Sequence, residues 1–403
     1  MPEAVIVATA RSPIGRAFKG SLVDVRPDDL AATIVQAVLA KVPELDPDQV
    51  EDIILGCGLP GGEQGYNMAR VVSILAGLHD VPGTTVTRYC SSSLQTIRMA
   101  AHAIKAGEGD VFIAAGVEMV SRFVKGTSDG MPDTQNPRFS EAQARSARRS
   151  EGGAEPWAPA EGLPDVYIAM GQTAENVAEL EQVSREEMDR YAALSQQRAV
   201  KAQEDGFFRD EITPVTLPDG STFEVDDGPR PNTTVEVLAT LKPAFRPDGR
   251  VTAGNSCPLN DGAAAVVVMS DTRARQLGIA PLARIVSSGV SALNPEIMGL
   301  GPIEASRQAL KRAGMTIGDV DLVELNEAFA AQVVPCARHL GIEWDKLNVH
   351  GGAIALGHPF GMTGARIMTT LLNGLAHEDA NVGLETMCVG GGQGMAMVVE
   401  RLS

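Results

Sequence analysis

The sequence predicts a layered α/β fold in which helices pack against buried strands. Short apolar runs rich in Val and Ile alternate along the chain with segments whose apolar residues recur at helical spacing. Hydrophobic residues make up 44% of the chain but aromatic residues only 4%, so the interior must be built from Ala, Val, Ile, Leu and Met. This composition is typical of strands that helices cover on both faces.

The strand candidates are uninterrupted apolar runs at Val5–Ala8, Asp52–Gly56, Val111–Gly116 and Val266–Met269. The helix candidates have one apolar face. They cover Asp28–Lys41, with Asp28 or Asp29 as the cap, then Ser91–Gly107, and then Ser184–Glu204, which opens with a capping-box-like Ser-x-x-Glu.

With 403 residues the chain is long enough for two or three domain-sized units. A polar turn followed by an apolar strand occurs at Asp46–Gly58 and again at Thr316–Phe329, which indicates two similar halves. Between Ser121 and Arg250 the pattern loosens and Pro, Gly, Ser and Arg are enriched. We therefore expect an N-terminal half at 1–120 plus 251–275, an inserted domain at 121–250 and a C-terminal half at 276–403.

The charge of the chain limits its partners. There are 34 basic and 51 acidic side chains, a formal charge of −17, which argues against nucleic acid or an anionic membrane as the main partner. No stretch is apolar for about 18 residues, and the first residues lack the basic flank of a signal peptide. A cytoplasmic enzyme without a membrane span is expected.

Five cysteines are scattered along the chain, and their spacing contains no CxxC pair: Cys57, Cys90, Cys257, Cys336 and Cys388. Neither a disulfide framework nor a cysteine zinc site is indicated, so free thiols are expected. The ordinary role of a single free cysteine is that of a small buried apolar side chain.

Two segments place a reactive side chain next to a turn or a helix start. In TRYCSSSLQ, Cys90 precedes a predicted helix, whose unpaired N–H groups and dipole favour a thiolate; burial beside a serine cap is the alternative. In NVHGGAIALGHPFGMTGAR, His358 lies among glycines that allow close approach, and Pro359 disfavours helical geometry at the histidine; a structural histidine in a Gly-rich turn is the alternative.

Two further segments complete the set. CVGGGQG places Cys388 at a strand end beside glycines whose N–H groups could bind an oxyanion, although a tight hairpin explains the same glycines. In NEAFA, Asn326 either caps a helix or holds a water or carbonyl oxygen in a site.

Together, in this order and spacing, the four segments resemble the signature of the thiolase family. The resemblance covers nearly the whole chain and includes RSPIG at Arg11–Gly15, MGQTAEN at Met170–Asn176, RPNTTVEVLATLKPAF at Arg230–Phe245 and TAGNSCPLNDGAAAVVVMS at Thr252–Ser270. It implies a thiolase fold of two similar α/β halves, layered α-β-α-β-α with five strands in each sheet, plus an inserted loop domain that holds coenzyme A. It also implies a homodimer or homotetramer.

The resemblance assigns roles at five positions. Cys90 is the acylated nucleophile, His358 the base that activates it, and Cys388 the acid/base at the α-carbon of acetyl-CoA. Asn326 holds a water, and the N–H groups of Cys90 and Gly390 bind an oxyanion.

For coenzyme A, a co-substrate and not a permanently bound cofactor, the resemblance places Arg230 beside the adenine. Along the pantetheine it places Met170, Ala253, Cys257, Met298, Ala328 and Phe329, and it implies no metal ion. The cluster of Arg138, Arg145, Arg148 and Arg149 either meets phosphates or, as is commoner for such a run, forms a solvated surface.

The implied activity is that of an acyl-CoA:acetyl-CoA C-acyltransferase of the fatty-acid β-oxidation type. It cleaves 3-ketoacyl-CoA to acetyl-CoA and a shortened acyl-CoA by a ping-pong route through acyl-Cys90, and the reverse reaction is a Claisen condensation. A biosynthetic acetoacetyl-CoA thiolase is the alternative. Ser93, His350, Ala169 and Cys257 depart from the family pattern; Ala169 and Cys257 stand where biosynthetic thiolases have histidine and serine.

Two rival interpretations remain. A ketoacyl-synthase-type condensing enzyme shares the duplicated fold, but it generates its carbanion by decarboxylation and does not need Cys388. A catalytically silent acyl-CoA-binding subunit could have the same fold. The sequence has no marker for or against a partner subunit that carries other β-oxidation steps.

Overall fold

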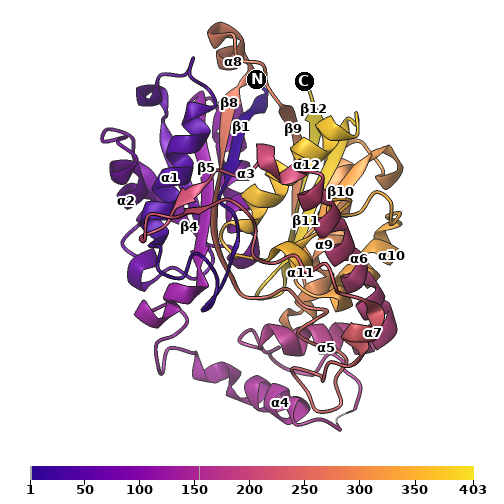
Figure 1. The fold of residues 1–403 in the computed structure, drawn as a ribbon. Helices are drawn as coiled ribbons and strands as arrows, with labels where there is room; N and C mark the ends of the chain where they lie inside the picture. Colours follow the sequence, from indigo (N-terminus) through magenta and orange to yellow (C-terminus); the bar gives the residue numbers. More distant parts are fainter. Residues whose placement is uncertain (1, 154) are drawn as a thin grey trace.

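The strands form two groups in the structure, a computed structural model that describes residues 2–153 and 155–403 (Figure 1). The first group has the order β4-β3-β5-β8-β1 and the second the order β9-β12-β11-β10. A short strand, β2 (Gly15–Arg16), pairs with β8, and β6 (Val215–Thr216) pairs with β7 (Thr222–Phe223) in a separate hairpin. The remaining strands are β1 Ala4–Arg11, β3 Asp52–Cys57, β4 Gly83–Val86, β5 Val111–Met119, β8 Asn260–Ser270, β9 Ala283–Ala292, β10 Leu322–Leu325, β11 Val382–Val389 and β12 Gln393–Arg401.

The helices lie in three layers around these strands (Figure 1). One apolar cluster joins α1 (Pro27–Ala40) and α2 (Met68–Leu75) to the outer face of the first group, and another joins α9 (Gly301–Ala313) and α10 (Ala330–Leu340) to the outer face of the second. Between the groups, α3 (Ser92–Ala106) and α12 (Thr363–His377) share a third cluster with both. Because alternate residues of the longer strands enter different clusters, both faces of these strands are covered, and the α-β-α-β-α prediction is confirmed.

The sheets differ from the prediction in two details. They are not separate, because β1 and β9 pair at Val5–Arg284 and Ile6–Ala283 before they diverge around the central helices. The second half has four strands and not five, since the fifth position is reduced to a single bridge between Val323 and Leu347. Asn348, with a φ of +46°, turns the chain away directly after that bridge.

The predicted helices are present with one correction. Helices α1, α3 and α6 (Arg185–Glu204) match the expected spans, and Ser184 forms the expected capping box with Glu187. Neither Asp28 nor Asp29 caps α1, however. The helix starts at Pro27, whose fixed φ suits the first helical position. The carboxylate of Asp28 instead accepts hydrogen bonds from the Arg26 guanidinium, at 3.0 and 2.7 Å.

The inserted segment lies mainly at one end of the molecule (Figure 1). It contains α4 (Ser140–Ser150), α5 (Met170–Leu180), α6 and α7 (Val235–Ala239); the short α8 (Asp271–Leu277) and α11 (Ala353–Leu356) lie outside it. Arg11 at the end of β1 is fully buried and ties the segment to the first group of strands. It donates to Glu211 at 2.7 Å and to both oxygens of Asp226 at 2.9 and 3.0 Å.

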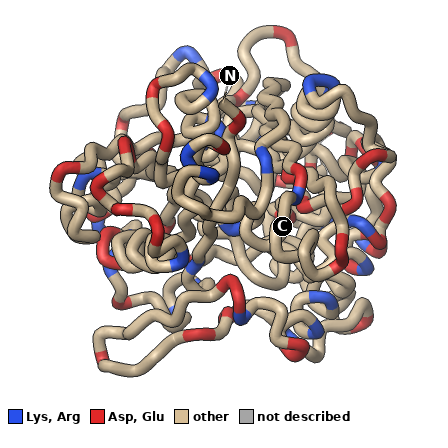
Figure 2. The backbone as a smooth tube through the Cα atoms, turned by 90° about the horizontal axis from the view of Figure 1, so that it is seen from above, with Lys and Arg blue, Asp and Glu red and all other residues tan. Residues whose placement is uncertain are grey.

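Acidic residues are spread around the outside of the molecule (Figure 2), in keeping with the charge of −17. Within residues 2–153 and 155–403, no helix is both long and apolar enough to cross a membrane.

The two central helices meet through their backbones at Gly364. A Cβ atom there would lie 2.3 Å from the backbone nitrogen of Leu94 in α3. Beside this contact, the Ala365 N–H donates to Ser93 Oγ at 2.9 Å. Since backbone atoms cannot move aside as a flexible side chain can, α12 can approach α3 this closely only with glycine at position 364.

We predict that Gly364→Ala lowers the free energy of unfolding by about 1–3 kcal/mol because the added methyl group forces α3 and α12 apart. Gly374→Ala is a matched control in the same helix: its Cβ would make only ordinary contacts, the nearest at 3.4 Å, and alanine favours helix by up to about 1 kcal/mol. Urea unfolding followed by circular dichroism gives both values. Equal unfolding midpoints for the two variants would contradict the claim that the backbone contact at Gly364 limits how closely α12 can approach α3.

Candidate active site

Cys90 lies in the sharp turn between β4 and α3. Residues Tyr89–Ser91 form a 3-10 turn, and α3 begins at Ser92. Tyr89 has a left-handed φ of +43°, which costs a non-glycine residue about 1–3 kcal/mol, so the surrounding contacts must hold it. Ser92 Oγ does so by donating to the Tyr89 carbonyl at 2.7 Å and accepting from the Arg88 N–H at 2.9 Å. Cys90 as a whole residue is partly exposed at the helix start, but its thiol is enclosed by the protein.

The pKa of Cys90 differs from the prediction. The helix start was expected to favour the thiolate, but burial raises the pKa of this thiol to about 12. The N–H groups of Gly390 and of Cys90 itself pull the pKa down, as the helix-start argument requires, but their effect is smaller than that of burial. Cys90 is therefore a protonated thiol at neutral pH, and it needs a base to become a nucleophile.

Cys388 lies at the end of β11, fully buried. Burial raises the pKa of this thiol well above its usual value, and the neighbouring thiols of Cys90, Cys336 and Cys257 raise it further. The chain then passes through Gly390–Gly392 into β12, so the glycines do form a hairpin, with φ of +76° at Gly391 and +80° at Gly392. The same turn also approaches the nucleophile, because a Cβ at Gly390 would lie 3.3 Å from the Tyr89 ring.

His358 is buried, and its hydrogen-bond partners fix its tautomer. Thr363 Oγ1 donates to the carbonyl of Pro359 at 2.7 Å, so it must accept from His358 Nδ1, also at 2.7 Å. Nε2 is then the unprotonated nitrogen, and Asn326 Nδ2 donates to it at 3.2 Å. Burial and the Arg366 guanidinium lower the pKa of His358 to about 3, so the ring is neutral at physiological pH.

Asn326 is not a helix cap. It follows β10, while α10 begins only at Ala330 with Phe329 in the cap position. Its Nδ2 meets His358, and its buried Oδ1 has no hydrogen-bond partner among the residues that the structure describes. A buried amide oxygen needs a donor, so this geometry suits the alternative role of holding a water.

Sequence reasoning missed two buried carboxylates that hold the loops around these side chains. Glu118, at the end of β5, accepts hydrogen bonds from the N–H groups of Gly58 at 2.6 Å and Gly361 at 2.9 Å. Glu327 accepts from Tyr191 Oη and Ser195 Oγ, each at 2.6 Å. The available signal was an acidic residue inside an otherwise apolar run, VFIAAGVEMV for Glu118 and NEAFAA for Glu327.

Most of the residues predicted to contact coenzyme A belong to, or pack against, the apolar cluster that contains Cys388. Met298, Ala328 and Phe329 belong to the same apolar cluster as Cys388, and Met170 packs against it. The Cys257 N–H donates to the carbonyl of Ala328 at 3.0 Å. Ala253 and Arg230 are exposed and lie outside this cluster.

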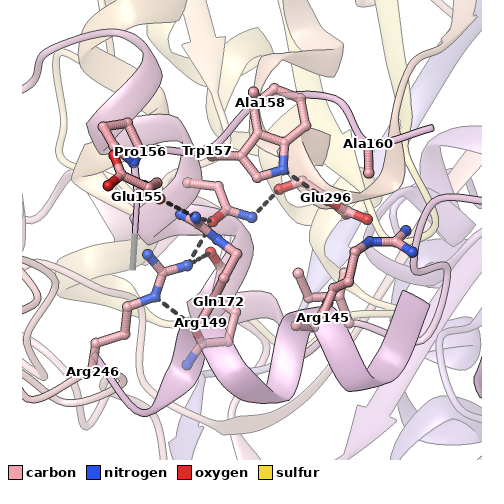
Figure 3. A pocket seen from close by; sticks show the side chains of 13 residues that line it. Arg145, Arg149, Glu155, Pro156, Trp157, Ala158, Ala160, Gln172, Arg246 and Glu296 are labelled. Carbon is pink, nitrogen blue, oxygen red and sulfur yellow. Dashed lines mark hydrogen bonds between the residues drawn. The ribbon is translucent and has the colours of Figure 1, made fainter. Parts of the chain in front are cut away.

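The arginine cluster of the inserted segment is divided. Arg145 and Arg149 of α4 line a cavity of about 190 Å³ together with Arg246 and Glu296 (Figure 3). Arg149 donates to Glu179 at 2.6 Å, and Arg246 donates to the other oxygen of Glu179 at 2.7 Å. Arg138 and Arg148 are exposed. The solvated-surface interpretation therefore fits Arg138 and Arg148. Arg149 instead forms an ion pair with Glu179 inside the inserted segment.

Comparisons with known proteins cover both halves of the chain. The family models for the N-terminal domain of thiolase and the C-terminal domain of thiolase match residues 4–272 and 279–401. The chain is 45% identical to a 3-ketoacyl-CoA thiolase of Bacillus subtilis, over 99% of this chain and all of the relative, and 43% identical to one of Aeromonas salmonicida, over the full length of both.

Two solved structures are similar over nearly the whole chain. One is the acetyl-CoA acetyltransferase of Bacillus anthracis, with a TM-score of 0.86 and 38% identity over 100% of this chain and 99% of that one. The other is the dimeric peroxisomal thiolase of Saccharomyces cerevisiae, with a TM-score of 0.89 and 37% identity over 99% of this chain and 97% of that one. With both halves matched and the relatives aligned end to end, this chain belongs to the thiolase family.

Proposed function

We propose that this chain is a 3-ketoacyl-CoA thiolase, an acyltransferase that cleaves 3-ketoacyl-CoA with coenzyme A into acetyl-CoA and a shortened acyl-CoA. The observation that carries the proposal is the pair of neighbouring thiols, Cys90 and Cys388, in a chain that also has a buried, neutral His358. A condensing enzyme that decarboxylates its substrate has no use for the second thiol. The curated relatives described above bear the name of this activity.

The first half-reaction needs a base, because Cys90 is protonated at rest. In the proposed route, Nε2 of His358 takes the proton from Cys90, and the thiolate attacks the C3 carbonyl of the substrate. The N–H groups of Cys90 and Gly390, which act on the Cys90 sulfur in the free enzyme, bind the resulting oxyanion. The bond between C2 and C3 then breaks, leaving the acyl group on Cys90.

The electron pair of the broken bond passes into the enolate of acetyl-CoA. The thiol of Cys388 protonates C2 of this enolate and is left as a thiolate. The enolate oxygen is stabilised by the protonated Nε2 of His358 and by a water on the free Oδ1 of Asn326. In the second half-reaction the thiol of coenzyme A gives its proton to Cys388, attacks the acyl group and releases Cys90, which recovers its proton from His358. The reverse sequence is the Claisen condensation.

We infer that coenzyme A enters as a co-substrate and is not permanently bound. The apolar side chains of Met170, Met298, Ala328 and Phe329 suit the pantetheine. Ala253 and Cys257 would line the rest of its path, and Arg230 would lie at the adenine. The inserted domain at 121–250 would hold the nucleotide end, between an N-terminal half at 1–120 plus 251–275 and a C-terminal half at 276–403.

We further propose a homodimer or homotetramer. The yeast relative is described as dimeric, and large apolar side chains such as Phe18, Tyr66 and Ile74 are exposed on this chain. A cytoplasmic location suits five cysteines that are all unpaired in the structure, because a reducing compartment keeps thiols free. A role in fatty-acid β-oxidation, alone or with a partner subunit, follows from the degradative direction.

Replacing Cys388 tests the second thiol. Cys388→Ala and Cys388→Ser should lower thiolysis of acetoacetyl-CoA by more than about 100-fold, because no acid is left to protonate the enolate. Acetylation of Cys90 by acetyl-CoA, followed as the mass increase of its peptide, should persist because it needs no proton transfer at C2. Cys336→Ala removes another buried thiol and should retain thiolysis. Unchanged thiolysis in the Cys388 variants would sink the proposed chemistry.

The pH dependence of alkylation tests how Cys90 is activated. A pKa raised by burial means that the thiolate fraction is small at pH 7 and grows about tenfold per pH unit. Labelling of Cys90 by short pulses of iodoacetamide should therefore keep accelerating above pH 9, where a cysteine peptide with an ordinary pKa of about 8.5 levels off. Peptide mass spectrometry resolves the site. If the alkylation rate of Cys90 reached a plateau below pH 8, the N–H groups at the helix start would lower the pKa of this thiol more than burial raises it.

The acyl chain length tests the degradative role against the biosynthetic alternative, which the likeness to an acetyl-CoA acetyltransferase favours. Ala169 and Cys257 depart from the biosynthetic pattern, so we expect kcat/KM for 3-ketoacyl-CoA substrates of six carbons and more to equal or exceed that for acetoacetyl-CoA. Thiolysis confined to acetoacetyl-CoA would assign the biosynthetic role. No turnover of any length would instead support a silent acyl-CoA-binding subunit.

A further inference from the structure

Three side chains with metal-ligating atoms meet at the C-terminal end of α12, away from the candidate active site. His377 is the last residue of α12, Glu378 follows it, and His350 comes from the loop after the Val323–Leu347 bridge. One ligand atom from each, a ring nitrogen from each histidine and a carboxylate oxygen, lie within 4.8 Å of one another. His350 also departs from the family pattern, and the proposed thiolase chemistry leaves it without a role.

The ligand set is that of a transition-metal site. Two imidazoles and one carboxylate are a common zinc set, which leaves a fourth position for water. Ligand atoms about 2.0–2.1 Å from a tetrahedral zinc ion lie about 3.4 Å apart, so the three groups must close by about an ångström. His377 and Glu378 are exposed and can make this adjustment by rotation, whereas His350 is buried.

His350 is already held in place. Its ring stacks on Phe207 with 3.6 Å between the ring centroids and 6° between the planes, and the His377 ring stands edge-on to it at 5.9 Å. A fixed first ligand lowers the entropic cost of assembling the site.

The charges around the three residues have both signs. Glu378 contributes a carboxylate, and the carbonyl end of α12 is the negative end of the helix dipole, which favours a cation. Arg198 opposes the cation, but its guanidinium is engaged by the carbonyls of Leu347 and Trp344, at 2.5 and 2.7 Å. The chain as a whole carries a charge of −17.

We propose that His350, His377 and Glu378 bind one divalent transition-metal ion of the zinc class. The ion joins the end of α12 to the loop that carries His350, where Gly374 of α12 already lies close to the His350 ring. The proposed thiolase route uses none of these three residues, and no hydrogen bond or aromatic contact of the described residues joins them to Cys90, His358 or Cys388.

The test uses the full chain without a histidine tag and with its reactive thiols alkylated by iodoacetamide, so that cysteines do not compete for the metal. Titration with Zn²⁺ by calorimetry should show one ion per chain, and Co²⁺ should give the visible absorption of a tetrahedral N/O site. His377→Gln and His350→Asn should each weaken the apparent Kd more than tenfold, since even the loss of a supporting contact costs about 10–100-fold. Zn²⁺ should raise the Tm of the alkylated chain that carries no substitution.

His339→Gln is the matched control. His339 is an exposed histidine 2.8 Å from the carboxylate of Glu181, a pair without a third ligand, and its loss should leave the Kd unchanged. His377 and Glu378 are on the surface, so their variants keep the fold even if the buried His350 variant does not. The proposal would be overturned if the chain without substitutions bound Zn²⁺ no more tightly than His377→Gln does. It would also be overturned if only the non-alkylated protein bound Zn²⁺. In either case His350 would be only a part of an aromatic cluster.

Discussion

The site depends on the backbone contact between α3 and α12. Each of these helices follows a reactive segment: the Cys90 turn comes before α3, and the His358 loop comes before α12. Because Gly364 lets the helices touch, and Ser93 Oγ accepts from the Ala365 N–H at 2.9 Å, the starts of both helices are fixed relative to each other. The turn that carries Cys90 and the loop that carries His358, one from each half, are thus held in place by packing deep in the middle layer.

Buried carboxylates then make irregular backbone tolerable around the site. Loops buried in an apolar interior would leave N–H groups without partners, at a cost of about 1–3 kcal/mol each. Glu118 accepts from N–H groups of two such loops, at Gly58 and Gly361. Glu327 accepts from α6 side chains and from the Ile354 N–H at 3.0 Å, which links the inserted segment to the His358 loop. The desolvation of each charge is offset by several hydrogen bonds to the same group.

Much of the fold could be predicted from the sequence because apolar periodicity reports burial directly. The spans of α1, α3 and α6 and the layered arrangement of the strands followed from it. The cap of α1 was mispredicted because Pro27 and Asp28 both signal a helix start, and only tertiary packing decides between them. The fifth strand of the second half stops at the Val323–Leu347 bridge, where Asn348 takes a positive φ; asparagine tolerates this conformation, but its presence alone does not predict it.

The sequence points to candidate reactive residues, whose roles stay predictions, but not to the contacts that control their protonation. Cys90, Cys388 and His358 carry chemistry that is visible in their type and context. The tautomer of His358 depends on Thr363, and the pKa of Cys90 depends on how far burial exceeds the pull of nearby N–H groups; both are properties of the packed interior. Asn326 illustrates the same limit, because a cap and a water-holding amide have the same sequence context, and only the start of α10 at Ala330 separates them.

The raised pKa of both thiols has a consequence for the durability of the protein. Peroxides and other oxidants attack thiolates, and they react slowly with protonated sulfur. Cys90 and Cys388 are neighbours, yet each is held as a thiol by its buried surroundings. Such a pair resists oxidation while the protein waits for substrate, and in the route proposed above it gains reactivity only for the short time in which His358 draws the proton from Cys90.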